Sequence, residues 1–487
     1  MADGAQTEFS ALLRIGHDDL ATGSGGVFEH LSPVTGRLQG RVPLAGAEEV
    51  NRAVEKAAAA AESWRRVRPE ARRQILLKLA DLIRANVGEF ARLAAIDGGT
   101  PLPSGTGMAM LSAEWHAYYA GWCDKQDGQV YSTFDTRDEF SYAAPEPYGV
   151  VGIIITWNGP LISLGMKVAP ALAAGNCVIV KPAEVTPFAP DLYARLVREA
   201  GVPDGVFSLL PGSAEAGEAL VRHPKVEKIS FTGGPITARR ILAACAEDLK
   251  PCVLELGGKS ASLLFPDCGD LDAACQRAVQ WSIGVMAGQG CALPTRLLVH
   301  ESIHDEVVER LIAIARSYRV GDPLEEGVRV GPLINAAACD RVMGMLDRVR
   351  AEGTGTIVLG GSRCGGDLAG KNYIEPTIIT DVDPASEIGQ VEVFGPVLVV
   401  MKFKDEDEAV QLANSTRYGL AAYIQSQDVR RVHRLAERLK AGGVYVNGAT
   451  QIHPYTPFGG LGLSGFGKEG GRAGLDEFVR YKTVTIA

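Results

Sequence analysis

The segment GIIITWNGPLISLGMKVAPALAAGNCVIVKPAEVTP, residues 152–187, contains two apolar, β-branched runs separated by a stretch that can form a helix. The same alternation continues along the chain with the runs VFSLL, KISFTG and CVLEL. Near-continuous apolar strands that alternate with helices are typical of a parallel sheet covered on both faces. The chain from residue 148 to residue 256 is therefore predicted to form an α/β domain.

A second α/β series follows, with the strand-like runs RLLVH, TIVLGG, YIEPTIIT, PVLVVMKF, AAYIQSQ and GGVYVNG. Two such series indicate two domains, and the chain is expected to cross between them near Gly257 and Gly258. Ahead of the first series, residues 47–96 show the three- and four-residue apolar spacing of helices. Residues 27–45 are predicted to form a hairpin, and the first ten or so residues to be loosely ordered.

Two further segments alternate like exposed strands but belong to neither series: QVYSTFDTRDEFSYAAPEP, residues 129–147, and the tail VRYKTVTIA. Strand edges without a partner are prone to pair with other chains. We therefore expect these segments to pair across subunits of an oligomer.

Composition excludes several classes of function. The 487 residues carry a net charge of −9 without a long basic run, which argues against binding to nucleic acid or anionic lipid. The apolar stretches are interrupted before they reach membrane-spanning length, and no secretory signal is visible at the start. Nine cysteines without paired spacing favour reduced thiols in the cytoplasm. The scattered histidines leave a metal site without support.

One cysteine stands out, Cys291 in GVMAGQGCALPTRLLV, residues 284–299. Free cysteines are usually buried core residues, but the small neighbours of Cys291 leave its sulfur accessible to a ligand. Polar residues and glycine turns also follow the predicted strands, including Asn158, Lys181 and Glu255. In open parallel sheets, ligands bind beyond the carboxyl ends of the strands. The sequence therefore predicts a site at this edge of the first sheet.

These residues resemble the aldehyde dehydrogenase superfamily. The motifs TWNGP, KPAE, FTGG, LELGGK, GQGC, EVFGPV, NSTRYGL and PFGGLGLSGFGKEGG occur in the family's order and span nearly the whole chain. The resemblance implies an α/β, aldehyde dehydrogenase-like fold with two parallel-sheet α/β domains plus a small β oligomerisation element. It assigns residues 1–127 and 148–256 to an NAD-binding domain, 257–469 to a catalytic domain, and 128–147 with 470–487 to the oligomerisation element.

The resemblance also implies the roles of the catalytic residues. Cys291 matches the nucleophile, Glu255 the general base and Asn158 the oxyanion donor. Lys167 matches a lysine near the base. A thiolate that attacks an aldehyde needs these partners, because the carbonyl oxygen becomes an alkoxide and the resulting thioester must be hydrolysed by an activated water.

The implied cofactor is NAD, with NADP possible. Lys181 and Glu184 match residues that hold the adenosine ribose, and Glu392 matches the one at the nicotinamide ribose. Backbone amides after FTGG can approach a pyrophosphate at a helix start. The remaining cofactor residues are expected to be Ile154, Thr156, Trp157, Gly233, Gly234, Leu256 and Phe394.

Several residues depart from the family pattern. Thr156 stands where a proline is usual, Gly234-Pro235 replace Ser-Thr, and Val391 replaces the first acid of a Glu-Glu pair. Individual motif residues also have ordinary structural interpretations. Asn158-Gly159 can be a turn, Lys181-Pro182 can end a strand, and Glu255 can be a paired carboxylate.

The family resemblance places small residues along the substrate tunnel, where relatives carry larger ones. The tunnel residues are expected to be Gly159, Leu161, Ser163, Met166, Gly290, Ala292, Ile452 and Phe458. A wide apolar tunnel favours a bulky apolar or aromatic aldehyde, because each buried methylene contributes about 0.8 kcal/mol. The alternatives are a CoA-acylating semialdehyde dehydrogenase and a non-catalytic NAD-binding relative. The expected partners are a small-molecule aldehyde and further copies of the chain, in a homodimer or homotetramer.

Overall fold

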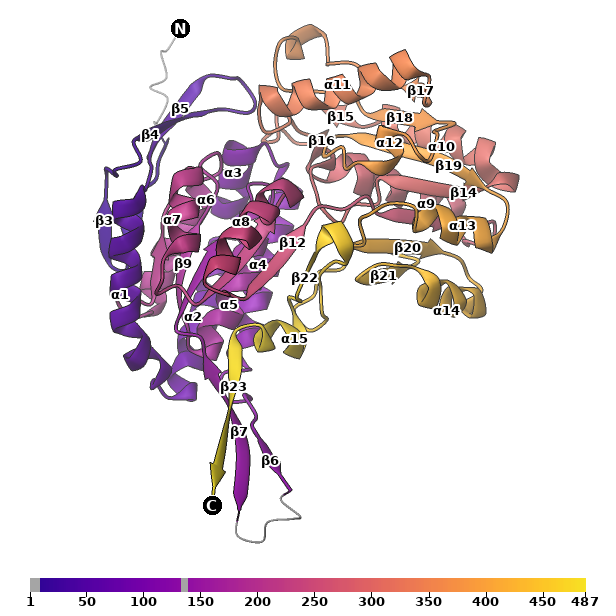
Figure 1. Ribbon diagram of the computed structural model, residues 1–487. Coiled ribbons are helices and arrows are strands. Elements are labelled where there is room, and N and C mark those ends of the chain that lie inside the picture. Colours follow the sequence, from indigo (N-terminus) through magenta and orange to yellow (C-terminus); the bar gives the residue numbers. More distant parts are fainter. Residues whose placement is uncertain (1–8, 133–138) are drawn as a thin grey trace, which may run out of the picture.

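Two sheets with helices packed around them form the two halves of the molecule (Figure 1). The computed structural model describes residues 9–132 and 139–487. The loosely ordered start that we predicted falls mostly on residues 1–8, which lie outside the described residues. The predicted hairpin is confirmed as β4 (Val27–Leu31) and β5 (Leu38–Pro43), with β1 (Phe9–Ser10) paired to β5.

The first sheet has the strand order β22-β12-β11-β8-β9-β10-β2-β3. Its parallel strands confirm the predicted runs: β8 (Val150–Ile154), β9 (Cys177–Lys181), β10 (Phe207–Leu209), β11 (Lys228–Gly233) and β12 (Cys252–Leu256). Antiparallel strands complete its edges: β2 (Leu13–Ile15), β3 (Asp18–Leu20) and β22 (Gly465–Phe466). The chain runs from β8 outward to β10 and then returns to β11. The order therefore reverses between β8 and β11, where ligands bind in sheets of this kind.

Helices cover this sheet, and the predicted helical region 47–96 is confirmed. The N-terminal helices are α1 (Ala47–Arg65), α2 (Pro69–Ala85), α3 (Val87–Gly98) and α4 (Leu102–Ala120). The helices between strands are α5 (Pro160–Ala174), α6 (Phe188–Ala200), α7 (Ala214–Arg222) and α8 (Pro235–Glu247). Helix α5 begins with a proline and ends at Gly175, whose φ of +99° is a left-handed conformation that glycine adopts without strain.

The second sheet has the strand order β17-β18-β19-β14-β13-β20-β21 and is parallel except for β17. Its strands are β13 (Ala261–Leu264), β14 (Arg296–His300), β17 (Thr356–Leu359), β18 (Thr377–Thr380), β19 (Val397–Phe403), β20 (Ala421–Gln425) and β21 (Gly443–Val446). Its helices are α9 (Leu271–Val279), α10 (His304–Arg316), α11 (Ala336–Glu352), α12 (Glu387–Gln390), α13 (Glu406–Ala413) and α14 (Val429–Arg438). A separate pair consists of β15 (Arg319–Val320) and β16 (Val328–Val330). The first sheet ends its parallel strands at Leu256 and the second begins at Ala261, which confirms the predicted crossing near Gly257.

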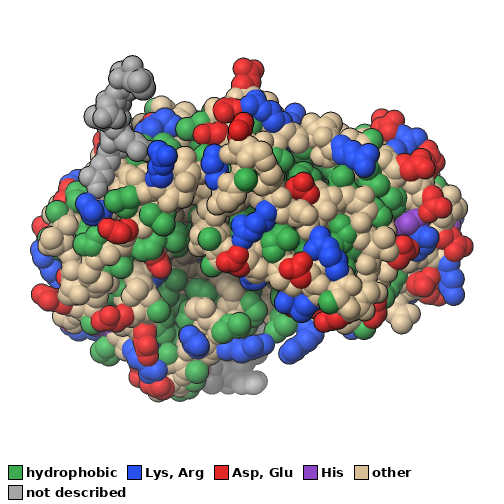
Figure 2. Space-filling view, turned by 90° about the horizontal axis from the view of Figure 1, so that it is seen from above, with side chains coloured by type: hydrophobic (Ala, Val, Ile, Leu, Met, Phe, Trp, Pro, Cys, Tyr) green, Lys and Arg blue, Asp and Glu red, His purple; other side chains and the backbone are tan. Residues whose placement is uncertain are grey.

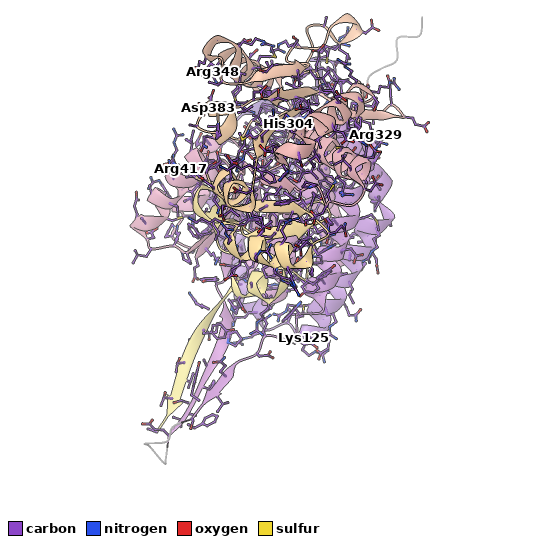
Figure 3. The ribbon with its side chains drawn as sticks, turned by 90° about the vertical axis from the view of Figure 1, so that its right-hand side faces the viewer. Lys125, His304, Arg329, Arg348, Asp383 and Arg417 are labelled. Atoms are coloured by element: carbon purple, nitrogen blue, oxygen red, sulfur yellow. The ribbon has the colours of Figure 1, made fainter. Side chains whose placement is uncertain are left out.

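A third, three-stranded sheet extends away from both halves (Figures 1 and 3). It consists of β6 (Gln129–Tyr131), β7 (Phe140–Pro147) and β23 (Val479–Ile486), and β23 is antiparallel to β7 along its whole length. The two segments that we expected to pair across subunits therefore pair with each other within one chain. Strands β6 and β23 each occupy one edge of β7, and pairing of their outer edges across subunits stays a prediction.

The chain returns to the first half before it enters β23. Strand β22 lies beside β12, and α15 (Gly471–Asp476) contacts the first half, where the Tyr119 hydroxyl donates to the Gly471 carbonyl at 3.1 Å. Residues 470–476 were predicted to belong to the oligomerisation element. In the structure α15 packs against α5 of the first half as well as against β23, and the boundary at residue 470 stays a prediction.

Charged side chains of both signs are interspersed over the face seen in Figure 2. Within residues 9–132 and 139–487, no helix combines the length and apolar character needed to cross a membrane. The same residues contain no cluster of three or more His, Cys, Asp or Glu side chains suited to hold a metal ion.

Candidate active site

Cys291 lies where two cavities meet. One cavity, here called the large cavity, has a volume of about 480 Å³, and the other, here called the strand-end cavity, has a volume of about 370 Å³. Four residues line both cavities: Thr156, Asn158, Thr232 and Cys291. A ligand in either cavity can therefore reach the region of the sulfur.

The loop that carries Cys291 is tightly held. Met286 and Ala287 have φ values of +50° and +51°, a left-handed conformation that is uncommon for residues with a side chain. A Cβ atom on Gly258, in the crossing between the sheets, would lie 2.6 Å from the Cys291 carbonyl oxygen. The crossing segment therefore packs directly against the cysteine loop, which explains the need for glycine there.

The Cys291 thiol is protonated in the ligand-free protein at neutral pH. Burial raises the pKa of this thiol to about 12, and the nearby carboxyl groups of Glu392 and Glu255 act in the same direction. A thiolate, not a thiol, is the reactive nucleophile. The site must therefore remove this proton, or add a positive charge, before the sulfur can react.

Asn158 follows β8 and has a fixed side-chain amide. Its Nδ2 group donates a hydrogen bond to the Gln289 carbonyl at 2.9 Å, which leaves its second N–H free. Because Asn158 and Cys291 line both cavities, this N–H and the backbone N–H of Cys291 are suited to stabilise an oxyanion. The removal of one such donor typically costs roughly 3–4 kcal/mol of transition-state stabilisation.

Glu255, at the end of β12, has a carboxyl group that is 4% exposed and lines the large cavity. Neither of its oxygens has a hydrogen-bond partner in the described part of the chain. Burial, with the nearby charge of Glu469, raises its pKa well above the usual value for glutamic acid, and Lys167 opposes this shift. A buried carboxyl group without partners is costly. This cost and the raised pKa are typical of a catalytic base.

Lys167 does not bond to Glu255 directly. Its fully buried ammonium forms a short ion pair with Glu469 and donates to the Ser230 hydroxyl at 3.0 Å. Glu469 also lines the large cavity. We did not single out Glu469 from the sequence, because its only mark there is its place within the glycine-rich motif.

The strand-end cavity contains most of the residues predicted to bind the cofactor. Its lining includes Thr156, Trp157, Gly233, Gly234, Leu256, Glu392 and Phe394. The rings of Trp157 and Phe394 meet edge to face, with centroids 5.5 Å apart. Ile154, Lys181 and Glu184 lie beyond this lining, at or after the ends of β8 and β9. The Lys181 ammonium is 3.6 Å from the Glu184 carboxylate.

Two observations indicate that the strand-end cavity is suited to a dinucleotide. Gly234 precedes α8, and a Cβ atom there would meet no atom within 4 Å, so the helix N-terminus is open to an anionic group. Glu392 accepts a hydrogen bond from the Gly258 amide at 3.0 Å through one carboxylate oxygen, which leaves the other for a ribose hydroxyl. Burial raises the pKa of Glu392 to about 7, whereas Lys259 and Arg341 lower it.

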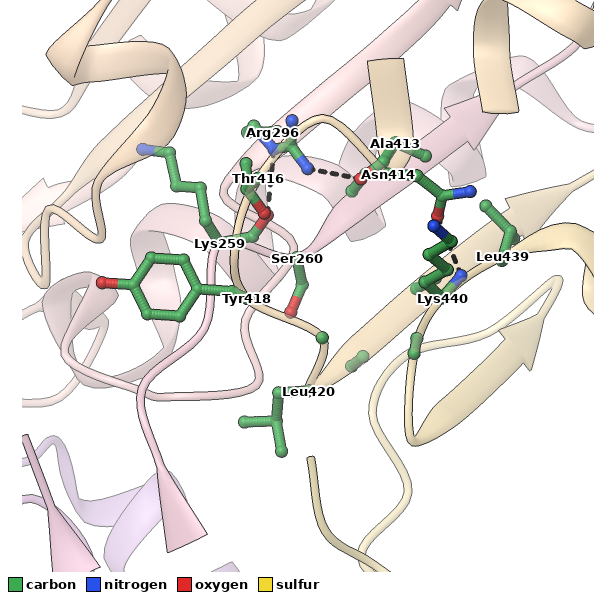
Figure 4. A pocket seen from close by; sticks show the side chains of 15 residues that line it. Lys259, Ser260, Arg296, Ala413, Asn414, Thr416, Tyr418, Leu420, Leu439 and Lys440 are labelled. Carbon is green, nitrogen blue, oxygen red and sulfur yellow. Dashed lines mark hydrogen bonds between the residues drawn. The ribbon is translucent and has the colours of Figure 1, made fainter. Parts of the chain in front are cut away.

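Lys259 and Arg341 are two residues at or near the strand-end cavity that we did not predict. Lys259 is 1% exposed, its ammonium has no hydrogen-bond partner among residues 9–132 and 139–487, and burial together with Arg296 lowers its pKa to about 7. Arg296 donates to the carbonyls of Lys259 and Ala413 (Figure 4). Arg296 therefore holds the backbone of the crossing segment, while Lys259 supplies a buried cationic group near Glu392.

The large cavity is lined by most of the residues that we predicted for the substrate tunnel, whose role stays a prediction. Its lining includes Gly159, Ser163, Met166, Gly290, Ala292, Ile452 and Phe458. Leu161 was predicted to line the tunnel, but it does not line the large cavity. It lies in the core and is 1% exposed, and Ile162 lines the cavity instead. Positions 159, 162, 163 and 166 share one face of α5, whereas position 161 lies on another face.

Further wall residues came from segments that we did not connect to the tunnel. They are Pro103, Ser104, Gly107, Met108 and Leu111 on α4, Gln280, Trp281, Val285, Met286 and Leu293 near the cysteine, and Thr450. The α4 positions repeat at helical spacing, which was readable in the sequence. Nothing in the sequence showed that this face of α4 turns toward Cys291.

The family model described as "Aldehyde dehydrogenase family" matches residues 21–484, and the chain belongs to this family. Aldehyde dehydrogenase 1 from Tanacetum cinerariifolium is 40% identical over 95% of this chain and 92% of its own length. Phenylacetaldehyde dehydrogenase from Pseudomonas fluorescens is 41% identical over 94% of this chain and 92% of its own length.

Solved structures agree with this assignment. A point mutant of betaine aldehyde dehydrogenase from Staphylococcus aureus, in complex with NAD+ and with a modified cysteine, has a TM-score of 0.95 at 33% identity. The match covers 98% of this chain and 97% of that one. The predicted fold class is therefore confirmed.

Proposed function

We propose that this chain oxidises a bulky apolar or aromatic aldehyde to the carboxylic acid with NAD, through a thioester on Cys291. The position of Cys291 is the main support for the proposal, because this residue lines both the large cavity and the strand-end cavity. This arrangement would let an aldehyde in one cavity and a dinucleotide in the other reach the same sulfur. Proximity of this kind accounts for a large part of enzymatic rate enhancement.

In the first step, the Cys291 thiol transfers its proton to water, and the sulfur attacks the carbonyl carbon of the aldehyde. The carbonyl oxygen becomes an alkoxide, which the free N–H of Asn158 and the backbone N–H of Cys291 stabilise. Bound NAD supplies the hydride acceptor that converts the resulting thiohemiacetal to a thioester. Glu392, Trp157 and Phe394 are the residues that would hold the nicotinamide end in the strand-end cavity.

In the second step, Glu255 accepts a proton from water, and the hydroxide attacks the thioester carbon. The bond between this carbon and the sulfur breaks, which releases the acid and returns Cys291 as a thiolate. A raised pKa makes this carboxylate a stronger base than an exposed glutamate. Glu469, in the same cavity wall, forms an ion pair with Lys167, which is fully buried behind it. The positive charge of Lys167 opposes the rise in the pKa of Glu255 and so favours the ionised, basic form.

The shape of the large cavity supports the substrate class. Its volume of about 480 Å³ is suited to a small organic ligand. Met108, Leu111, Ile162, Trp281 and Phe458 make much of its wall apolar. An apolar wall favours larger apolar aldehydes by about 0.8 kcal/mol per buried methylene. The similarity to a phenylacetaldehyde dehydrogenase points to the same class.

The alternatives fit this site less well. Transfer of the acyl group to the thiol of CoA needs no base to activate water, yet Glu255 is held without partners in the cavity wall. A non-catalytic relative would not need to retain Cys291, Asn158 and Glu255 around one point.

The test is a steady-state screen of aldehydes with NAD and NADP, followed by NADH or NADPH absorbance. We expect a higher kcat/KM for phenylacetaldehyde and medium-chain aldehydes than for acetaldehyde, betaine aldehyde or succinate semialdehyde. Formation of an acyl-CoA only when CoA is added, a preference for acetaldehyde, or no turnover with any aldehyde would overturn the proposal.

We also propose that the three-stranded sheet joins subunits in a homodimer or homotetramer. It exposes several large apolar side chains: Val130, Tyr131, Phe140, Tyr481 and Ile486. Such exposed apolar surface is typical of an interaction site. A chain truncated before Val479 should dissociate or aggregate in light scattering after gel filtration, and an active, monodisperse truncated form with the oligomeric state of the full chain would refute this role.

The cytoplasm is the compartment that we propose for the protein. All nine cysteines are free thiols in the structure, which is the state that a reducing compartment maintains.

A further inference from the structure

Gln280 lies in the wall of the large cavity, at the start of the π-helix Gln280–Gly284 that continues α9. The backbone N–H of Val285 donates to the Gln280 carbonyl and closes this wider turn. A π-helical turn inserts one residue into a helix and is frequent at functional sites. Here it places Gln280, Trp281 and Val285 in the same cavity wall.

A hydrogen bond to its oxygen holds the side-chain amide of Gln280 in place. The Tyr318 hydroxyl donates to Gln280 Oε1 at 3.0 Å and itself accepts from Gln276 Nε2 at 2.9 Å. Burial raises the pKa of Tyr318, so its hydroxyl keeps the proton that it donates. Tyr318 and Gln276 do not line the large cavity. The oxygen of the amide therefore faces away from the cavity, toward Tyr318.

The nitrogen of this amide is unused. Gln280 Nε2 donates to no acceptor within the described ranges 9–132 and 139–487, and it is not completely buried. Trp281, Val285 and Met286 follow Gln280 in the sequence, and their apolar side chains line the same wall. An oriented donor in an apolar wall gains an acceptor only from water or from a ligand.

Other polar side chains of the large cavity are already engaged or are free to rotate. Asn158 and Glu255 belong to the reaction centre, and Thr450 donates to the Ala292 carbonyl at 3.2 Å. The hydroxyls of Ser104 and Ser163 can each turn to suit any ligand. Gln280 differs because its donor group has a fixed direction, and because it lines the large cavity but not the strand-end cavity.

We propose that Gln280 is a specificity-determining residue that donates from Nε2 to an acceptor oxygen on the part of the aldehyde remote from its carbonyl group. This inference rests on the proposed function and narrows the substrate class to aromatic aldehydes that carry an ether, hydroxyl or carbonyl oxygen on the ring. Buried donors that lose their acceptor discriminate strongly against analogues that lack it.

The test compares 4-methoxybenzaldehyde with 4-ethylbenzaldehyde, which has nearly the same shape but no acceptor oxygen. Binding is measured by calorimetry in the Cys291→Ala background with NAD present, so that the result does not depend on turnover. We expect tighter binding of the methoxy compound, and a loss of about fivefold in this preference in Gln280→Leu. Gln280→Glu keeps the size and the bond from Tyr318 but has no donor, and it should lose the preference as well.

Gln411→Leu is the matched control, because it makes the same substitution at an exposed position of α13. An unchanged methoxy preference in both Gln280 variants would overturn the inference, as would an equal loss in Gln411→Leu. The failure of the proposed function is seen separately, in the absence of NADH formation from either aldehyde when Cys291 is intact.

Discussion

The two cavities that meet at Cys291 are built in different ways. The strand-end cavity is lined largely by short motifs at the ends of parallel strands, such as Trp157 after β8 and Gly233 at the end of β11. The large cavity is lined by segments that are far apart in the chain, from α4, α5, the cysteine loop and the glycine-rich segment near Phe458. Sheet topology therefore determines the strand-end cavity, the proposed cofactor side, whereas helix packing determines the large cavity, the proposed aldehyde side.

This difference explains why the strand-end cavity has more recognisable sequence motifs than the large cavity. The strand-end cavity needs backbone groups and a few fixed polar side chains, so its residues keep recognisable spacing. The large cavity needs only volume and apolar character, which many combinations of side chains supply. Substitutions should accordingly act on both cavities at the four shared residues, which include Cys291, and on one cavity elsewhere.

The largest effect should come from Cys291→Ala, because this residue belongs to both cavities. We expect kcat to fall by about 10⁴-fold or more, as for the loss of other covalent nucleophiles. NAD binding by fluorescence titration and the melting temperature should stay close to those of the parent. Residual dehydrogenase activity within tenfold of the parent (a roughly 1.4 kcal/mol effect) would contradict the assignment of the nucleophile.

Glu255→Gln should separate the two half-reactions. Rapid mixing with NAD should give about one NADH for each active site, followed by a steady rate lower by about 10³-fold, because the thioester lacks its base. Intact-mass spectrometry should show the acyl group on Cys291. If the steady rate matches that of the parent, another group activates the water.

Gly159→Phe should damage only the aldehyde side. A Cβ atom at Gly159 meets no atom within 4 Å, so the added ring would extend into the large cavity. We expect kcat/KM for phenylacetaldehyde to fall by about 100-fold while that for acetaldehyde changes little. Gly88→Phe, at an exposed glycine of α3 that is equally open, is the control. Equal losses for both aldehydes would remove the distinction between the cavities.

The pH dependence should reflect the raised pKa values of Cys291, where the cavities meet, and of Glu255, in the large cavity. The proposed reaction uses the deprotonated forms of Cys291 and Glu255, and burial raises the pKa of both groups. Activity should therefore rise as the pH increases from 6 to 9. Alkylation of Cys291 by iodoacetamide in the protein without NAD, followed by peptide mass spectrometry, should accelerate by about tenfold per pH unit. A rate independent of pH would show that the thiol ionises near or below neutral pH.

The smallest effect should come from Glu184→Ser, beyond the far side of the strand-end cavity. The Glu184 carboxylate would repel the 2′-phosphate of NADP, although Lys181 beside it attracts the same group. We expect the ratio of kcat/KM for NADP to that for NAD to rise by about fivefold. An unchanged ratio would place the discrimination between the two cofactors at other residues.

The sequence predicted the strands of both sheets, the crossing near Gly257 and the residues around Cys291. These features depend on local patterns: apolar runs make buried strands, and parallel strands end at one edge of a sheet. Glu469 and Lys259 escaped prediction because their importance comes from contacts with residues far away in the chain. The pairing of β7 with β23 was also missed, since strand pairing between distant segments leaves no mark in either segment alone.

The sequence by itself determined the fold class, the family and the order of the reacting groups, because these depend on spacing along the chain. Only the tertiary structure decided which face of α5 lines the large cavity, and so replaced Leu161 with Ile162. It alone brought α4 against the cysteine loop, paired Lys167 with Glu469 and left the amide nitrogen of Gln280 without an acceptor. The physical reason is that cavity shape and burial arise from the packing of distant segments, which periodicity within one segment does not specify.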